Sequence, residues 1–115
     1  MNVVIVGCGG IAAVHAECIR QLPDLEPVGF ADIVKEKAER FAENYGGRAY
    51  SSLEEALANE KPDVLHICTP HYLHVPMAIQ GLKSGAHVFM EKPPVISLEQ
   101  LNELKEAVAD TKKQL

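Results

Sequence analysis

Short apolar runs and amphipathic stretches alternate along this chain, and the alternation predicts buried strands separated by helices. Most of the apolar runs are rich in valine, isoleucine or leucine and are bounded by glycine, proline or aspartate. Strands are expected at residues 2–6, 26–31, 48–50, 64–68 and 86–90. Helices are expected between them, at 10–22, 35–45, from Ser52 to the turn at Lys61, at 74–83 and from Ser97 to about Lys112.

Signals at the helix boundaries support this division. The glycine pair 46–47 ends the second helix, and the segments 52–55 and 97–100 are capping boxes that open the third and last helices. Repeated strand–helix units predict a parallel sheet covered by helices on both faces. The expected fold is a single α/β domain over residues 1–115: a doubly wound (Rossmann) parallel sheet of about five strands in the order 3-2-1-4-5.

A glycine-rich turn follows the first strand directly. The run Val3–Val6 stops at Gly7-Cys8-Gly9-Gly10-Ile11-Ala12, which matches the G-x-G-x-x-G/A fingerprint of dinucleotide-binding βαβ units. In this interpretation Gly7 permits the tight turn, Gly9 lets the backbone approach a pyrophosphate, and Ala12 lets the helix pack closely on the strand. The N–H groups and dipole at the helix start then face the phosphates. The alternative is an ordinary strand-to-helix turn in a nucleotide-free domain.

An acidic residue at the end of the second strand supports the dinucleotide interpretation. Asp32 lies 20 positions after Ala12, where the fingerprint requires a carboxylate for the ribose hydroxyls. A carboxylate there would also repel a 2′-phosphate, so the sequence predicts NAD in preference to NADP. Ile33 follows as a further candidate cofactor contact, and Lys35 and Lys37 are the nearby cations. A solvated aspartate at a strand end is the alternative, which the glycine turn disfavours.

Two further loops are expected on the same rim of the sheet, because the carboxyl ends of parallel strands share one edge. Thr69-Pro70-His71 and His74 follow the fourth strand and are expected beside the nicotinamide half of the cofactor. His71 and His74 have the spacing of two metal ligands on a helix, but no third ligand is evident, so no metal site is predicted. For His74, capping or packing is the alternative.

Glu91 and Lys92 follow the fifth strand and precede two prolines. A lysine directed into a cleft can donate to a substrate hydroxyl and stabilise negative charge that develops on its oxygen. Glu91 could accept from a ribose hydroxyl. A rigid surface turn is the alternative for both. His15, His66 and His87 fall inside expected elements and are interpreted as packing or capping residues.

Composition narrows the function classes. The chain has 115 residues, a formal net charge of −5 and no basic stripe, which argues against nucleic-acid binding. No signal peptide or membrane-length apolar run is present. Three widely spaced cysteines, Cys8, Cys18 and Cys68, are interpreted as reduced thiols, so a cytoplasmic location is expected. Cys8 is expected to turn its small side chain away from the ligand.

Together these motifs closely resemble the cofactor domain of the glucose–fructose oxidoreductase / inositol dehydrogenase (Gfo/Idh/MocA) family. The resemblance covers almost the whole chain, and the ordered pair of the Thr69-Pro70 and Glu91-Lys92-Pro93 loops is its most specific part. It implies NAD(P)-dependent oxidation or reduction of sugars, cyclitols and related polyols. The cofactor-binding residues it implies are Gly7, Gly9, Gly10, Ile11, Asp32, Thr69, Pro70, His71, His74, Glu91 and Lys92, and it also places Lys92 at the reacting carbon as the catalytic residue.

The chain departs from the family at two residue positions. His71 stands where asparagine is frequent, and Pro94 follows Pro93 where an aliphatic residue is frequent. Family members also continue into a second α/β domain that contacts the substrate, and a sixth strand is expected after the last helix. The 115 residues contain neither. We therefore expect an isolated cofactor domain without steady hydride transfer, and a polyol substrate only where a second domain is present.

Two other functions remain open at this stage. A stand-alone NAD-binding or NAD-sensing module would need the same cofactor site but no Lys92. A methyltransferase with a similar glycine turn gives no reason for the Glu91-Lys92 loop. The fifth strand is expected to be a sheet edge, and the last helix to have a partly covered apolar stripe, so a weak homodimer is also predicted.

Overall fold

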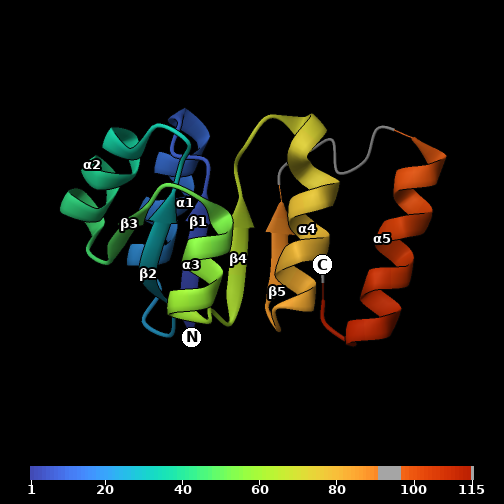
Figure 1. The fold of residues 1–115 in the computed structure, drawn as a ribbon. Helices are drawn as coiled ribbons and strands as arrows, with labels where there is room; N and C mark the ends of the chain where they lie inside the picture. Colours follow the sequence, from blue (N-terminus) through green and yellow to red (C-terminus); the bar gives the residue numbers. More distant parts are fainter. Residues whose placement is uncertain (91–96, 115) are drawn as a thin grey trace.

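The computed structural model describes residues 1–90 and 97–114, apart from the side chain of His71. The described chain forms one five-stranded parallel sheet in the order β3-β2-β1-β4-β5 (Figure 1). The strands are β1 (Asn2–Val6), β2 (Glu26–Ala31), β3 (Arg48–Tyr50), β4 (Val64–Ile67) and β5 (His87–Met90). The helices are α1 (Gly10–Arg20), α2 (Lys35–Tyr45), α3 (Leu53–Glu60), α4 (His74–Lys83) and α5 (Leu98–Thr111). The expected α/β class and strand order are confirmed.

The structure differs from the expected elements at several of their ends and by one additional short helix. α1 ends at Arg20 instead of residue 22, because the Gln21 N–H donates to the Cys18 carbonyl and the Leu22 N–H to the Ile19 carbonyl, which tightens the last turn. A short 3-10 helix, η1 (His71–Leu73), precedes α4 and was not expected. β4 and β5 are each one residue shorter than predicted. The serine N-cap of each predicted capping box forms, with the Ser52 hydroxyl accepting from the Glu55 N–H and the Ser97 hydroxyl from the Gln100 N–H.

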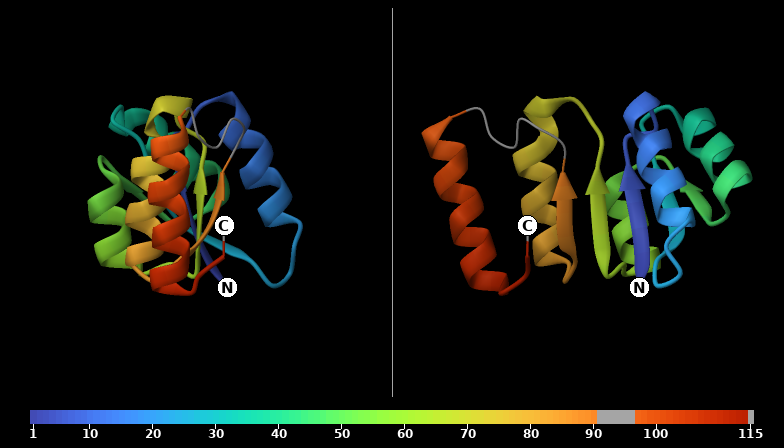
Figure 2. Two further views of the ribbon diagram at one scale, coloured as in Figure 1. Left: turned by 90° about the vertical axis from the view of Figure 1, so that its right-hand side faces the viewer. Right: turned by 180° about the vertical axis from the view of Figure 1, so that it is seen from behind.

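Strand alternation divides the core into two layers. In β1, Val3 and Ile5 face the layer beneath α1 and α2, while Val4 and Val6 face the layer beneath α3 and α4. The two helix pairs lie on opposite faces of the sheet, and α5 packs beside α4 (Figures 1 and 2). This layering leaves the carboxyl ends of β1, β2 and β4 together at one rim, where the predicted site lies.

The last helix returns the chain to the sheet. Leu104 of α5 is buried against the core, whereas Leu98 at its start is exposed, so the apolar stripe is only partly covered, as expected. Beyond α5, the Gln114 carbonyl accepts from the Val88 N–H at 2.9 Å, and the Gln114 N–H donates to Nδ1 of His87 at 2.9 Å. The described tail therefore pairs with part of the edge of β5. No helix in the described ranges is long and apolar enough to cross a membrane.

Candidate dinucleotide-binding site

The turn after β1 requires glycine at its first position. Gly7 has φ +88°, a conformation that residues with a side chain rarely adopt. A Cβ at Gly7 would also lie 2.7 Å from the carbonyl carbon of Cys68, so the turn presses directly on the backbone that follows β4. The Gly7 N–H donates to the Ala31 carbonyl at 2.8 Å. The first glycine thus joins the ends of three strands in one place.

The second and third glycines face open space. Among the residues that the structure describes, no atom lies within 4 Å of a Cβ built at Gly9 or Gly10, and no side chain caps the start of α1. No acidic residue lies in the first turn of α1. A helix start with no side-chain cap and no acidic residue in its first turn can accept an anion such as a pyrophosphate.

The carboxylate of Asp32 joins β2 to the glycine turn. One oxygen accepts from the Cys8 N–H at 2.7 Å and the other from the Val34 N–H at 2.8 Å. These two bonds fix the orientation of the carboxylate at the end of β2. Each carboxylate oxygen has a second lone pair, so the group can still accept from ribose hydroxyls.

Cys8 turns away from the open side of the turn, as expected. Its side chain is buried, and Sγ donates to the Ala31 carbonyl at 3.6 Å. Burial, with a smaller contribution from the Asp32 carboxylate, raises the pKa of Cys8 to about 12. The thiol therefore stays protonated and is a poor nucleophile.

These features border a cavity of about 310 Å³ at the rim of the sheet. Among the predicted site residues, the lining includes Gly7, Gly9, Asp32, Ile33, Thr69 and Pro70. The cavity is large enough to hold part of a dinucleotide.

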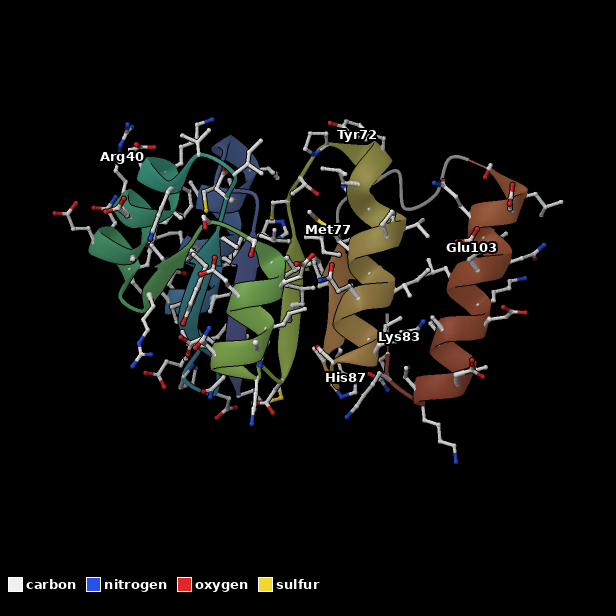
Figure 3. The ribbon with its side chains drawn as sticks, in the orientation of Figure 1. Arg40, Tyr72, Met77, Lys83, His87 and Glu103 are labelled. Carbon is white, nitrogen blue, oxygen red and sulfur yellow. The ribbon has the colours of Figure 1, made fainter. Side chains whose placement is uncertain are left out.

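Several other polar or flexible residues that line the cavity were not among the predicted site residues. They are Lys37 of α2, Ser51 and Ser52 between β3 and α3, Tyr72 of η1, and Met77 of α4. Tyr72 and Met77, both labelled in Figure 3, contribute to the cavity lining from η1 and α4. Ser51 and Ser52 follow the carboxyl end of β3, so the rule that identified the other loops could have found them.

Two side chains of α4 hold the turn after β4. Nε2 of His74 lies 2.9 Å from the Thr69 carbonyl oxygen, and the Thr69 hydroxyl donates to Sδ of Met77 at 3.5 Å. The His74 side chain is only 2% exposed and does not line the cavity. Direct contact between His74 and a cofactor therefore stays a prediction from the sequence.

Three predicted residues lie outside what the structure describes. These are Glu91, Lys92 and the side chain of His71. Gly10 and Ile11 lie at the start of α1 but not in the cavity lining. In the described part of the chain, no cluster of three or more histidine, cysteine or acidic residues could hold a metal ion.

A pair of histidines, His15 and His66, lies outside the cavity lining, on the α1 face of the sheet. Nδ1 of His15 and Nδ1 of His66 are 3.0 Å apart, so one ring donates to the other. The His66 ring stacks on Phe89 with a centroid distance of 5.0 Å. Burial, followed by the neighbouring His15, lowers the pKa of His66 to about 4. The two rings pack within the fold, as the sequence analysis expected.

Known proteins similar to this chain are oxidoreductases with an NAD-binding domain. The GFO_IDH_MocA family model, described as an oxidoreductase family with an NAD-binding Rossmann fold, matches residues 1–115. Glucose-6-phosphate 3-dehydrogenase of Bacillus subtilis is 34% identical, with the match covering 89% of this chain and 29% of that protein. D-glucoside 3-dehydrogenase of Escherichia coli is 35% identical, with coverages of 90% and 30%. The chain thus spans about a third or less of these relatives.

A solved structure supports the same comparison. The WlbA dehydrogenase of Bordetella pertussis, determined in complex with NADH and UDP-GlcNAcA, superposes with a TM-score of 0.94 at 32% identity. The superposition covers 100% of this chain and 36% of that one.

Proposed function

Because this chain belongs to the Gfo/Idh/MocA oxidoreductase family and forms its NAD-binding Rossmann domain, we propose that it serves hydride transfer between a nicotinamide dinucleotide and a sugar, cyclitol or related polyol. One observation carries the cofactor part of this proposal. The open glycine turn and the fixed Asp32 carboxylate border the same cavity. The polyol substrate class is supported by the relatives that act on glucose-6-phosphate and D-glucosides.

Each residue has a defined role in this proposal. The N–H groups at the start of α1 bind the pyrophosphate, and the absence of a Cβ at Gly9 leaves room for it. Asp32 accepts from the adenosine ribose hydroxyls. Thr69 and Pro70 border the cofactor from the β4 side. The bound nicotinamide supplies the hydride acceptor or donor, and the protein supplies its orientation.

We further propose that NAD is preferred over NADP. The Asp32 carboxylate is held in place by two backbone N–H groups, so it cannot easily move away from a 2′-phosphate. Lys37 also lines the cavity, and its positive charge offsets part of this repulsion. The preference therefore rests on Asp32 and is moderated by Lys37.

Calorimetric titration of the chain with NAD and NADP tests both proposals. The unmutated chain should bind NAD more tightly than NADP. Asp32→Ala should narrow this difference in affinity, because it weakens NAD binding and relieves the repulsion of the NADP 2′-phosphate. Asp32→Asn is the matched control for the structural bonds, since its amide oxygen can still accept one backbone N–H. Tighter binding of NADP by the unmutated chain would overturn the preference, and no binding of either would overturn the cofactor proposal.

The catalytic part of the proposal depends on Lys92, which the resemblance to the Gfo/Idh/MocA family places at the reacting carbon. Lys92→Ala should abolish hydride transfer in a protein that turns over and leave NAD affinity within about threefold, because the lysine acts on the substrate oxygen. If residues 1–115 bind NAD but form no NADH with any polyol, the binding role stands on its own. Robust turnover by these residues would make the chain a complete enzyme.

The three cysteines support a proposed location in the cytoplasm. Cys8, Cys18 and Cys68 form no disulfide in the structure, which describes all three. Free thiols persist in reducing compartments.

A further inference from the structure

The Thr69-Pro70 turn is fixed on its cavity side by the glycine turn. The Cys68 N–H donates to the Val6 carbonyl at 2.8 Å, which extends the β1–β4 pairing to the end of β4. The missing Cβ of Gly7 lets the two backbones approach closely, since a Cβ there would lie 2.8 Å from the Thr69 nitrogen. Any displacement of the Thr69 backbone would therefore change the shape of the cavity where its two walls meet.

The turn is also fixed by α4. The Thr69 carbonyl oxygen can only accept, so Nε2 of His74 must carry the proton in the 2.9 Å bond between them. The His74 ring is buried beneath the turn. Two neighbouring bonds act in the same region: the Thr69 hydroxyl donates to Met77, and the Leu73 N–H donates to the Pro70 carbonyl.

We propose that His74 is a positioning residue for the dinucleotide site. It holds the Thr69-Pro70 wall against the glycine turn through its Nε2–H donor and does not itself touch the cofactor. This inference rests on the proposed dinucleotide binding and adds to it. It assigns His74 a role different from the direct contact that the sequence suggested, because the ring lies behind the cavity wall and not in its lining.

Two amide variants separate this role from packing. In His74→Gln the side-chain amide nitrogen reaches about as far as Nε2 and can donate to the Thr69 carbonyl. In His74→Asn the same amide is one methylene shorter and stops short of it. The two variants introduce the same polar group into the same buried position, so they differ chiefly in whether the bond forms.

The measurement is calorimetric titration of each variant with NAD. We expect His74→Asn to weaken NAD binding by about tenfold, the typical effect of losing one buried hydrogen bond. We expect His74→Gln to stay within about threefold of the unmutated chain. Equal affinity of His74→Asn and the unmutated chain would overturn the proposal. Equal weakening by both amides would also overturn it, because the donor would then not be what matters.

Leu104→Ala controls for general loosening of the core. Leu104 is buried in the same apolar layer, but α5 contributes none of the residues that line the cavity. This variant should lose stability to urea and keep its NAD affinity. If Leu104→Ala weakened NAD as much as His74→Asn does, the effect of His74 would be structural and the proposal would be wrong. Failure of the unmutated chain to bind NAD would instead refute the proposed function.

If His74→Asn does not fold, His74→Phe provides the same comparison with the ring volume kept. It also lacks a donor and should weaken NAD by about tenfold, again relative to His74→Gln. Binding by His74→Phe at the affinity of the unmutated chain would overturn the proposal.

Discussion

At the scale of single residues, Gly7 and Gly9 stand two positions apart but are required for different reasons. Gly7 combines a positive φ with a close approach to the backbone at Cys68. Gly9 has neither constraint and borders the cavity. One glycine therefore serves the fold and the other serves the proposed ligand.

Alanine substitutions should separate these two roles. Gly7→Ala should destabilise the chain by about 3 kcal/mol, because the new methyl group meets backbone and the φ value is strained. Gly9→Ala should change stability by less than about 1 kcal/mol and weaken NAD binding by about tenfold, because its methyl group enters the cavity. Urea unfolding and calorimetry measure the two effects. A Gly9→Ala variant with normal NAD affinity would show that the pyrophosphate does not lie against this turn.

His66 should make stability depend on pH. Its pKa is lowered from 6.5 to about 4 in the folded chain, so the unfolded chain binds the proton more tightly. The stabilisation is fully present above the ordinary histidine pKa and is lost as pH falls from about 6.5 towards 4. Between about pH 7 and pH 5 the loss attributable to His66 is about 2 kcal/mol.

Comparison with His66→Gln removes the contribution of the carboxylates, which titrate in both proteins. The unmutated chain should lose more stability than the variant between these two pH values, as measured by urea unfolding. Parallel losses in the two proteins would show that His66 is not responsible.

At the scale of helices and strands, α3 ends in an unfavourable conformation. Lys61 caps this helix with φ 45° and ψ 60°, and its N–H donates to the Leu57 carbonyl at 3.1 Å. A residue with a Cβ is disfavoured in the left-handed region, where helices usually end in glycine. The side chain is exposed, so the strain lies in the backbone and not in lost packing.

Lys61→Gly should therefore stabilise the chain by about 0.5 to 1 kcal/mol, since relief of strain exceeds the extra entropy of glycine in the unfolded chain. Lys61→Ala is the matched control, because it removes the same side chain and keeps the Cβ. It should give no gain. Thermal or urea unfolding measures both, and a glycine variant no more stable than the alanine variant would contradict the expectation.

At the scale of the whole molecule, the described sheet has β5 as its last strand on one side. The pairing of Gln114 with Val88 occupies one backbone donor of that strand. Phe89 is 55% exposed, and the right panel of Figure 2 shows no described helix in front of β4 and β5 on this face. An apolar edge of this kind favours association between chains.

We therefore expect weak, concentration-dependent self-association of the 115-residue chain through β5 or α5. Phe89→Lys should shift the association to higher concentration, because a charge on an edge strand opposes pairing. Light scattering from micromolar to millimolar concentration measures the mass. A monomeric mass throughout that range would rule out the association.

The elements, their order and the main residues of the candidate site could all be predicted from the amino-acid sequence. Strand and helix positions follow from local periodicity and from caps such as Ser52 and Ser97, which involve neighbours a few residues apart. The parallel order follows from the alternation of strands and helices. Gly7, Gly9 and Asp32 could be predicted because a motif of fixed spacing places them at the ends of adjacent strands.

The contacts of these side chains could not be predicted from the sequence and depend on the three-dimensional packing. Asp32 bonds to Cys8, Gly7 presses on Cys68, and His74 lies behind Thr69 instead of in the cavity. Ser51 and Met77 reach the same cavity from separate elements. Spacing along the chain gives the face on which a residue lies, but its partners depend on how strands and helices pack across the sheet. The direction and burial of each side chain therefore follow from the packing of distant segments.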